Sequence, residues 1–129
     1  MGIKEDARTI LIGAPTDVLK TMGLANLNLA SRLSGDFDYI HFFAESVAQL
    51  TRKFSILKSH LRPTGMLWIS WKKGGKSELT LPKIIHIGYD HGLVESKTLS
   101  VDATWSAIKF THPKKGKVYN NSYGKLKDG

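Results

Sequence analysis

The chain has 129 residues, of which 41% are hydrophobic and 9% aromatic, and its formal net charge at pH 7 is +8. This length and composition predict one globular domain with a sizeable core. The absence of cysteine excludes disulfides and thiolate metal sites, and no apolar run approaches the roughly 20 residues of a membrane helix. Because the amino-terminal residues are too polar for a signal peptide, we expect a cytoplasmic protein.

The positive charge is concentrated toward the end of the chain. Residues 113–129 hold five lysines and one acidic residue, which gives this segment +4 of the total +8. Its few apolar groups cannot offset the entropy of ordering it, so we predict a disordered basic tail after a single domain of residues 1–112. Two roles stay open for the tail: it keeps the protein soluble, or it attracts nucleic acid or another polyanion.

Two strands are predicted before residue 34. Residues 8–13 form a short apolar run that Pro15 interrupts, which predicts a buried strand followed by one or two helical turns up to Met22. Residues 27–33 alternate apolar and polar side chains, a pattern typical of a brief, half-buried strand.

The stretch from Asp36 to Trp71 has the order strand, helix, strand. Residues 38–43 are β-branched and aromatic, and residues 66–71 are almost continuously apolar, as in strands buried on both faces. Between them, Ser46 and Gln49 have capping-box spacing, and an apolar helical stripe continues until residues 62–65 end the helix. This stripe comprises Val47, Leu50, Phe54, Leu57 and Leu61. Such a unit needs a crossover connection, so we expect parallel strands joined in the right-handed sense.

A second helix and a hairpin are predicted in the last third of the domain. Thr80, with Pro82 in the first turn, marks a helix start, Gly88 is expected to face the sheet, and Gly92 ends the helix in a left-handed conformation. Residues 94–101 and 105–111 then form the strands of an antiparallel hairpin. Together the elements predict an α/β fold: a small Rossmann-like three-layer sandwich with a mostly parallel sheet that ends in an antiparallel hairpin.

The sequence lacks the motifs of several common sites. The basic loop at residues 72–77 has Ser70 where a phosphate-binding P-loop needs its first glycine, and the end of the first strand lacks the dinucleotide-binding fingerprint. His86 and His91, five residues apart on a helix, would not share a face, and no GxSxG nucleophile elbow occurs. We therefore predict no metal site, no cofactor and no catalytic residue.

Cationic and aromatic residues gather where strands are expected to end. A loop of residues 102–104 would place Lys97 opposite Lys109, and two facing lysines repel unless an anion lies between them. We therefore predict an anion site beside Trp105. The alternatives are a shifted register, lysines that extend into solvent, and tryptophans that only fill the core. The candidate ligand-binding residues, which include one carboxylate at a strand end, are Trp71, Lys72, Lys73, Lys97, Trp105, Lys109 and Glu45.

Several runs of the sequence resemble known families. The order from the strand at Asp38 to Met66-Leu-Trp-Ile69, then helix and hairpin, is similar to the C-terminal half of class I S-adenosylmethionine-dependent methyltransferases. Leu33-Ser-Gly-Asp-Phe-Asp38, Leu67-Trp-Ile-Ser-Trp-Lys-Lys73 and Val101-Asp-Ala-Thr-Trp-Ser-Ala-Ile-Lys-Phe110 resemble a bacterial family known as domain of unknown function 3052. The resemblance, over about residues 7 to 112, implies a methyltransferase-like Rossmann domain in the bacterial cytosol, without an established activity.

Against true methyltransferases the sequence departs in two places. Ile12-Gly-Ala-Pro15 replaces their acidic, glycine-rich first loop, and Leu29-Ala-Ser-Arg32 offers no acid for the ribose hydroxyls of the cofactor. These departures predict no measurable binding of S-adenosylmethionine. The main expectation is therefore a non-catalytic module that binds an anionic small molecule or a protein partner. The alternatives are a degenerate S-adenosylmethionine-dependent methyltransferase and a nucleic-acid or polyanion binder that acts through the basic tail.

Overall fold

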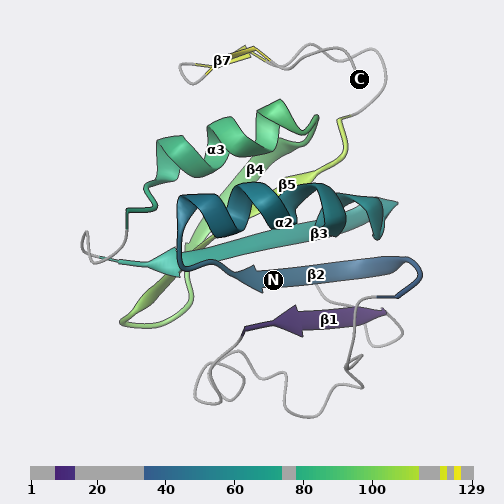
Figure 1. The fold of residues 1–129 in the computed structure, drawn as a ribbon, viewed down its shortest axis with the longest axis horizontal. Coiled ribbons are helices and arrows are strands. Elements are labelled where there is room, and N and C mark those ends of the chain that lie inside the picture. Colours follow the sequence, from purple (N-terminus) through teal and green to yellow (C-terminus); the bar gives the residue numbers. More distant parts are fainter. Residues whose placement is uncertain (1–7, 14–33, 74–77, 114–119, 122–123, 126–129) are drawn as a thin grey trace.

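A five-stranded sheet with the order β1-β2-β3-β5-β4 forms the centre of the protein (Figure 1). The computed structural model describes residues 8–13, 34–73, 78–113, 120–121 and 124–125. The sheet strands are β1 (Thr9–Ile12), β2 (Phe37–Phe43), β3 (Leu61–Lys72), β4 (Val94–Ser100) and β5 (Trp105–Thr111), and the helices are α2 (Val47–Ser59) and α3 (Leu81–Asp90). The helical turns predicted after Pro15, the strand predicted over residues 27–33 and the loop at 74–77 lie outside the described residues.

The strand direction changes after β3. β1, β2 and β3 are parallel neighbours, as the crossover through α2 requires, whereas β5 runs antiparallel to both β3 and β4. The prediction of a mostly parallel sheet is therefore right only for the first three strands. The reason is that the second strand of the hairpin, and not the first, pairs with β3, so the sheet contains two antiparallel pairs.

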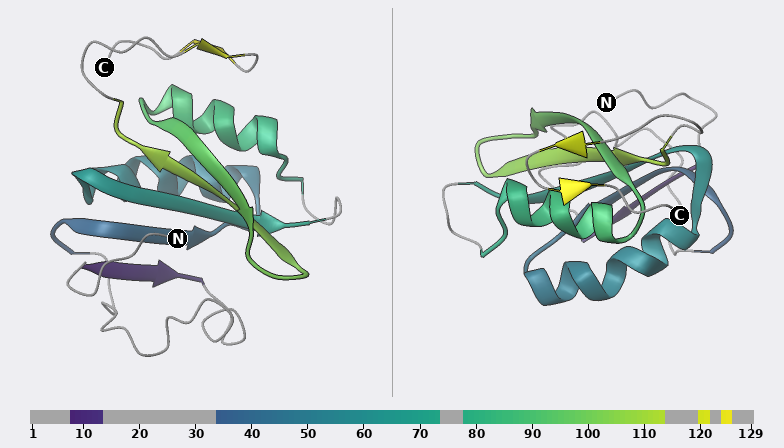
Figure 2. Two further views of the ribbon diagram at one scale, coloured as in Figure 1. Left: turned by 180° about the vertical axis from the view of Figure 1, so that it is seen from behind. Right: turned by 90° about the horizontal axis from the view of Figure 1, so that it is seen from above.

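Both helices lie on the same face of the sheet (Figure 2). Alternate strand residues point toward them, and Ile40 of β2 and Ile69 of β3 are fully buried in one cluster with Phe54 of α2. Gly88 of α3 faces β5 as predicted, because a Cβ at this position would lie 2.1 Å from the ring of Phe110. Among the described residues no helix covers the opposite face, so they show the sheet and one helical layer of the predicted three-layer sandwich.

The start of α2 follows the predicted capping pattern with one difference. The Ser46 Oγ accepts a hydrogen bond from the Gln49 backbone N–H at 3.0 Å. The Gln49 side chain, however, accepts from the backbone N–H of Glu45 at 2.7 Å and not from that of Ser46. The bond from the backbone to the Gln49 side chain therefore comes from the residue before Ser46, and not from Ser46 as a capping box requires.

The end of α2 differs more. Leu61, predicted as the last residue of the helical stripe, begins β3, and residues 62–65 belong to that strand instead of forming a stop. The reason is a long-range pairing, because Leu61 is the partner of Phe37 in β2. The register then shifts, and regular pairing of the two strands begins with Tyr39 and Met66. The prediction for α3 is confirmed, since Thr80 precedes its first residue and Gly92 follows it with φ of +81°.

A separate pair of short strands lies near the end of the chain. β6 (Asn120–Asn121) and β7 (Gly124–Lys125) form an antiparallel pair within the segment predicted to be a disordered tail. Because the remaining residues after 113 lie outside the described part, the tail expectation stays a prediction. Neither described helix is long and apolar enough to cross a membrane.

Candidate ligand site at the carboxyl edge of the sheet

The three parallel strands end at one edge of the sheet, which is where open α/β sheets bind ligands. At the end of β1, Gly13 adopts φ of +77°, a left-handed conformation that favours glycine. A Cβ at this position would lie 3.4 Å from the carbonyl oxygen of Phe43, so the Gly13 backbone passes close to the end of β2. Glu45 follows β2 with an exposed side chain. This edge thus places a close backbone approach and a carboxylate on neighbouring strands.

Two lysines leave the end of β3 in different directions. The Lys72 ammonium lies 5.7 Å from the centre of the Trp105 ring, which in turn packs edge-on against Phe43 at 5.1 Å. The Lys73 ammonium donates to the Ser100 Oγ and to the backbone carbonyl oxygen of Asp102. Within the described part of the chain neither lysine forms an ion pair. Both cations are therefore held by an aromatic ring or by neutral oxygens.

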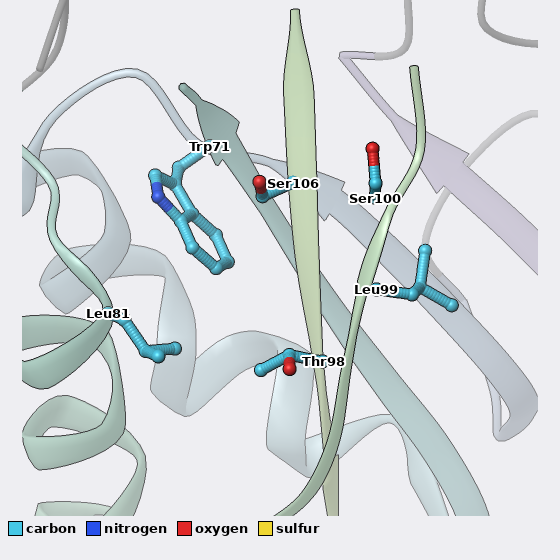
Figure 3. A pocket seen from close by; sticks show the side chains of 6 residues that line it. All are labelled: Trp71, Leu81, Thr98, Leu99, Ser100 and Ser106. Carbon is cyan, nitrogen blue, oxygen red and sulfur yellow. The ribbon is translucent and has the colours of Figure 1, made fainter. Parts of the chain in front are cut away.

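A groove of about 330 Å³ lies between the end of β3, the start of α3 and the hairpin (Figure 3). The indole of Trp71 and the side chain of Leu81 form one part of its wall, and hydroxyls from β4 and β5 form another. The lining residues are Trp71, Leu81, Thr98, Leu99, Ser100 and Ser106. Because Ser100 also accepts from Lys73, that lysine stands at the rim of the groove.

The hairpin register is the one predicted. Lys97 is the pairing partner of Lys109, Leu99 is the partner of Ala107, and the Val101 N–H donates to the Trp105 carbonyl oxygen. The Lys109 ammonium lies 6.0 Å from the centre of the Trp68 ring. Lys97 is exposed.

The anion predicted between the two lysines stays a prediction. The seven candidate residues fall into separate groups. Trp71 lines the groove, and Lys73 donates to the lining residue Ser100. Lys72 and Trp105 contact each other, Lys97 and Lys109 pair on the hairpin, and Glu45 follows β2.

A buried chain of hydrogen bonds, which the sequence reasoning missed, connects β2 and β3. The Tyr39 hydroxyl lies 3.0 Å from His41 Nδ1, and His41 Nε2 lies 2.6 Å from the Ser70 Oγ. Burial lowers the pKa of His41 to about 3 and raises the pKa of the Tyr39 phenol.

A serine hydroxyl at this distance from a histidine could act as a nucleophile with the imidazole as its base. Here, however, His41 and Ser70 have no exposed surface, and the imidazole is a weak base. The chain of hydrogen bonds therefore satisfies polar groups in the core. A signal for it was present, since Tyr39 and His41 are two residues apart and therefore lie on the same face of a strand that is otherwise apolar after Asp38.

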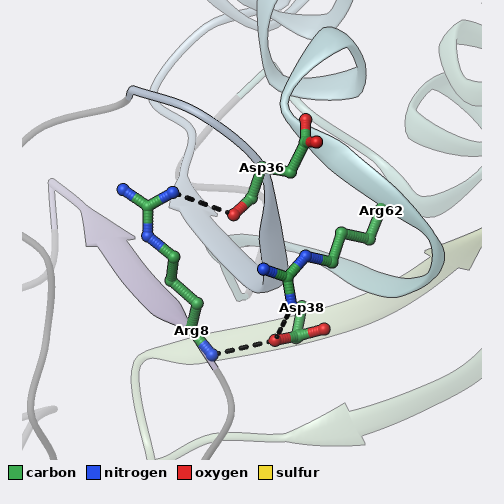
Figure 4. Close-up of polar contacts among 4 residues, drawn as sticks. All are labelled: Arg8, Asp36, Asp38 and Arg62. Atoms are coloured by element: carbon green, nitrogen blue, oxygen red, sulfur yellow. Dashed lines mark hydrogen bonds and ion pairs between the residues drawn. The ribbon is translucent and has the colours of Figure 1, made fainter.

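The opposite, amino edge of the sheet carries a charged cluster (Figure 4). Asp38 accepts hydrogen bonds from the Arg8 backbone N–H at 2.9 Å and from the Arg62 guanidinium at 2.8 Å. The Arg8 guanidinium donates to the Asp36 carbonyl oxygen and lies 4.3 Å from the centre of the Phe37 ring. Asp38 thus connects the starts of β1, β2 and β3.

Metal ligands do not gather in the part of the chain that the structure describes. Across residues 8–13, 34–73 and 78–113, no three His, Asp or Glu side chains form a group that could hold an ion. His86 instead lies 3.4 Å from Asp90 one helical turn away.

Comparison with known proteins supports the fold but not a particular family. No family model matches the chain, so the resemblance to domain of unknown function 3052 is unconfirmed, and no curated protein matches either.

Solved structures do match. A ribosomal protein L11 methylase from Lactobacillus delbrueckii subsp. bulgaricus aligns with a TM-score of 0.62 at 15% identity, over 88% of this chain and 73% of that one. A putative methyltransferase from Thermoplasma acidophilum aligns with a TM-score of 0.60 at 13% identity, over 92% and 73% of the two chains. A magnesium protoporphyrin IX methyltransferase from Synechocystis PCC 6803, with bound S-adenosylmethionine, aligns with a TM-score of 0.54 at 14% identity, over 75% of this chain and 51% of that one.

These matches define the fold as that of the class I methyltransferases. They also correct the main functional expectation. A non-catalytic module was inferred from missing loop motifs, yet the similar structures are methyltransferases, which favours the alternative of a degenerate enzyme. The sequence reasoning gave local loop motifs more weight than the overall order of elements.

Proposed function

We propose that the chain is a degenerate S-adenosylmethionine-dependent methyltransferase with its cofactor site at the carboxyl edge of β1 and β2. The observation that carries this proposal is the similarity to methyltransferase structures over 88% and 92% of the chain. "Degenerate" here means that the chain has the fold and part of the site, but fewer of the contacts that usually hold the cofactor.

The described residues at this edge fit a nucleoside in part. Gly13 ends β1 in the left-handed conformation that glycines adopt in nucleotide-binding loops, although its missing Cβ would face Phe43 of β2. The Glu45 carboxylate, exposed after β2, is the kind of acceptor that binds ribose hydroxyls. Pro15 has no backbone N–H to donate, and it lies outside the described residues. The expectation of no measurable binding thus becomes one of weak binding.

The cofactor and the protein would contribute different parts of the reaction. When bound, S-adenosylmethionine supplies an electrophilic methyl group, since its sulfonium sulfur leaves as a neutral thioether while the acceptor's lone pair forms the new bond to carbon. The residues of this chain would bind and orient the cofactor. The Glu45 carboxylate would accept hydrogen bonds from the ribose hydroxyls, and the Gly13 backbone would lie beside the ligand.

Titration calorimetry with S-adenosylhomocysteine tests this function. We expect saturable binding that Glu45→Gln weakens about fivefold, because the variant loses one charged hydrogen-bond acceptor worth about 1 kcal/mol at an exposed position. Lys53→Met, on the exposed face of α2, is the matched control and should leave the affinity unchanged. A folded protein that gives no binding heat at millimolar ligand would refute the proposal.

A further inference from the structure

The groove beside Trp71 differs from the cofactor edge in position and in chemistry. It opens between α3 and the hairpin, on the far side of β3 from β1 and β2. The Trp71 indole offers a flat aromatic surface, and the hydroxyls of Thr98 and Ser106 offer both donors and acceptors. The Ser100 hydroxyl already donates to the Asp102 carbonyl oxygen and accepts from Lys73, so it can offer a ligand only an acceptor. An aromatic surface beside a row of hydroxyls suits a planar ring whose faces are apolar and whose edges form hydrogen bonds.

A positive charge stands at the rim of this groove. The Lys73 ammonium donates to the Ser100 hydroxyl and to the Asp102 carbonyl oxygen, which are both neutral. The carboxylate of Asp102 is turned toward its own loop, where Oδ1 accepts from the backbone N–H groups of Thr104 and Trp105 at 2.8 Å each. An ammonium has three donors, so Lys73 has one more for a ligand. The rim is therefore suited to an anionic group.

We propose that this groove binds a nucleotide, with the base stacked on Trp71, the edge of the base bonded to the hydroxyls, and the phosphate at Lys73. Two sources share this chemistry: a free mononucleotide and an unpaired nucleotide within a single strand. S-adenosylmethionine has no phosphate, so the site differs from the cofactor site in the ligand that it selects. Nucleotide binding here does not require methyl transfer.

The binding test uses AMP, adenosine and a short oligoadenylate as probes of the full chain, followed by titration calorimetry. Trp71→Ala should weaken AMP about tenfold or more, because stacking on an aromatic side chain contributes about 1 to 3 kcal/mol per base. Trp71→Phe keeps a stacking surface and should stay within about threefold of the wild type. AMP should bind about tenfold more tightly than adenosine, since only AMP has the charged group that pairs with Lys73.

A charge-matched pair separates the groove from general electrostatics. Lys73→Met should remove the preference for AMP over adenosine, and Lys73→Arg should restore most of it. Lys53→Met removes the same charge from the exposed face of α2 and should leave that preference intact. Melting temperatures show whether Lys73→Met acts through its hairpin contacts, and the rescue by arginine distinguishes the two effects.

Several results would overturn the nucleotide site. These are equal affinity for AMP and adenosine, an unchanged affinity in Trp71→Ala, an equal loss in Lys53→Met, or no saturable binding of any probe by the folded protein. Binding of AMP assigns the site to free nucleotides, and binding of oligoadenylate alone assigns it to a single strand. Trp71→Ala should weaken AMP and leave the affinity for S-adenosylhomocysteine unchanged, whereas Glu45→Gln should weaken S-adenosylhomocysteine and leave AMP unchanged, so this site and the cofactor site succeed or fail separately.

Discussion

The two edges of the sheet hold their charged side chains in different ways. At the amino edge, Asp38 accepts from the Arg8 backbone N–H and from the Arg62 guanidinium, so the opposite charges of Asp38 and Arg62 meet each other. The Arg8 guanidinium is the exception at this edge, because it is held by the Asp36 carbonyl oxygen and the Phe37 ring. At the carboxyl edge, Lys72 lies over an aromatic ring and Lys73 donates to neutral oxygens. Charges that pair within the protein stabilise the fold, whereas charges held by neutral groups are available to a ligand. We therefore expect the Asp38–Arg62 pair to stabilise the fold, and we propose the carboxyl edge as the binding edge.

The largest expected effect lies between the two edges, at the buried His41. Burial lowers its folded pKa from 6.5 to about 3, so within this window the unfolded chain binds a proton that the native protein does not. The contribution of His41 to the free energy of unfolding is fully present above pH 6.5. It should fall as the pH is lowered from there toward 3, by up to about 1.4 kcal/mol per pH unit.

Urea unfolding of the wild type and of His41→Gln between pH 7 and pH 5 measures this dependence. The glutamine amide still reaches hydrogen-bond partners but does not titrate, so the variant should show a shallower loss of stability. Parallel curves for the two proteins would show that His41 does not titrate in this window.

The next prediction compares one carboxylate from each edge. Asp38→Ala should lower the free energy of unfolding by about 1 to 2 kcal/mol, because two donors lose a shared, partly exposed acceptor. Glu45→Ala should change it by less than about 0.5 kcal/mol, since the side chain is exposed. Chemical denaturation of both variants is the measurement. A larger loss for Glu45 than for Asp38 would reverse the assignment of the two edges.

A pair of left-handed glycines distinguishes strain from binding. Gly13 and Gly92 have φ of +77° and +81°, so alanine at either position should cost about 1 kcal/mol of stability. Only Gly13 lies at the carboxyl edge, and only Gly13→Ala should weaken S-adenosylhomocysteine. If Gly92→Ala weakens the ligand as much, the effect is one of general stability and Gly13 has no special role.

The smallest expected change in stability is that of replacing Lys72, a lysine at the carboxyl edge that has no ion pair in the described part of the chain. Lys72→Met should change the free energy of unfolding by less than about 0.5 kcal/mol, because its cation–π contact is at an exposed position. Thermal or urea unfolding with an error of a few tenths of a kcal/mol is sufficient. A loss as large as that of Asp38→Ala would place Lys72 among the structural charges.

The sequence predicted the elements that depend on local pattern. The apolar spacing of α2, the glycine that ends α3 and the hairpin register are encoded within a few residues, and all three match the structure except at the end of α2. The order of strands was not encoded in this way, since no local pattern specifies that β5, and not β4, pairs with β3.

Apart from the contact between Tyr39 and His41, the contacts that the sequence reasoning missed join distant residues. Asp38 meets Arg8 and Arg62 across 30 and 24 positions, and His41 meets Ser70 across 29. The Trp71 groove likewise exists only once α3 and the hairpin are in place. Single residues such as Trp71 and Lys73 could be selected as candidates by type and position, but their common groove required the tertiary structure.

The most direct test of the binding role of the carboxyl edge is to map S-adenosylhomocysteine onto the protein by the amide chemical shifts in NMR spectra. We expect shifts at Gly13 and at Phe43 to Glu45, with Asp38 and Arg62 at the amino edge unchanged. Shifts confined to the amino edge, or none at saturating ligand, would contradict a binding role of the carboxyl edge.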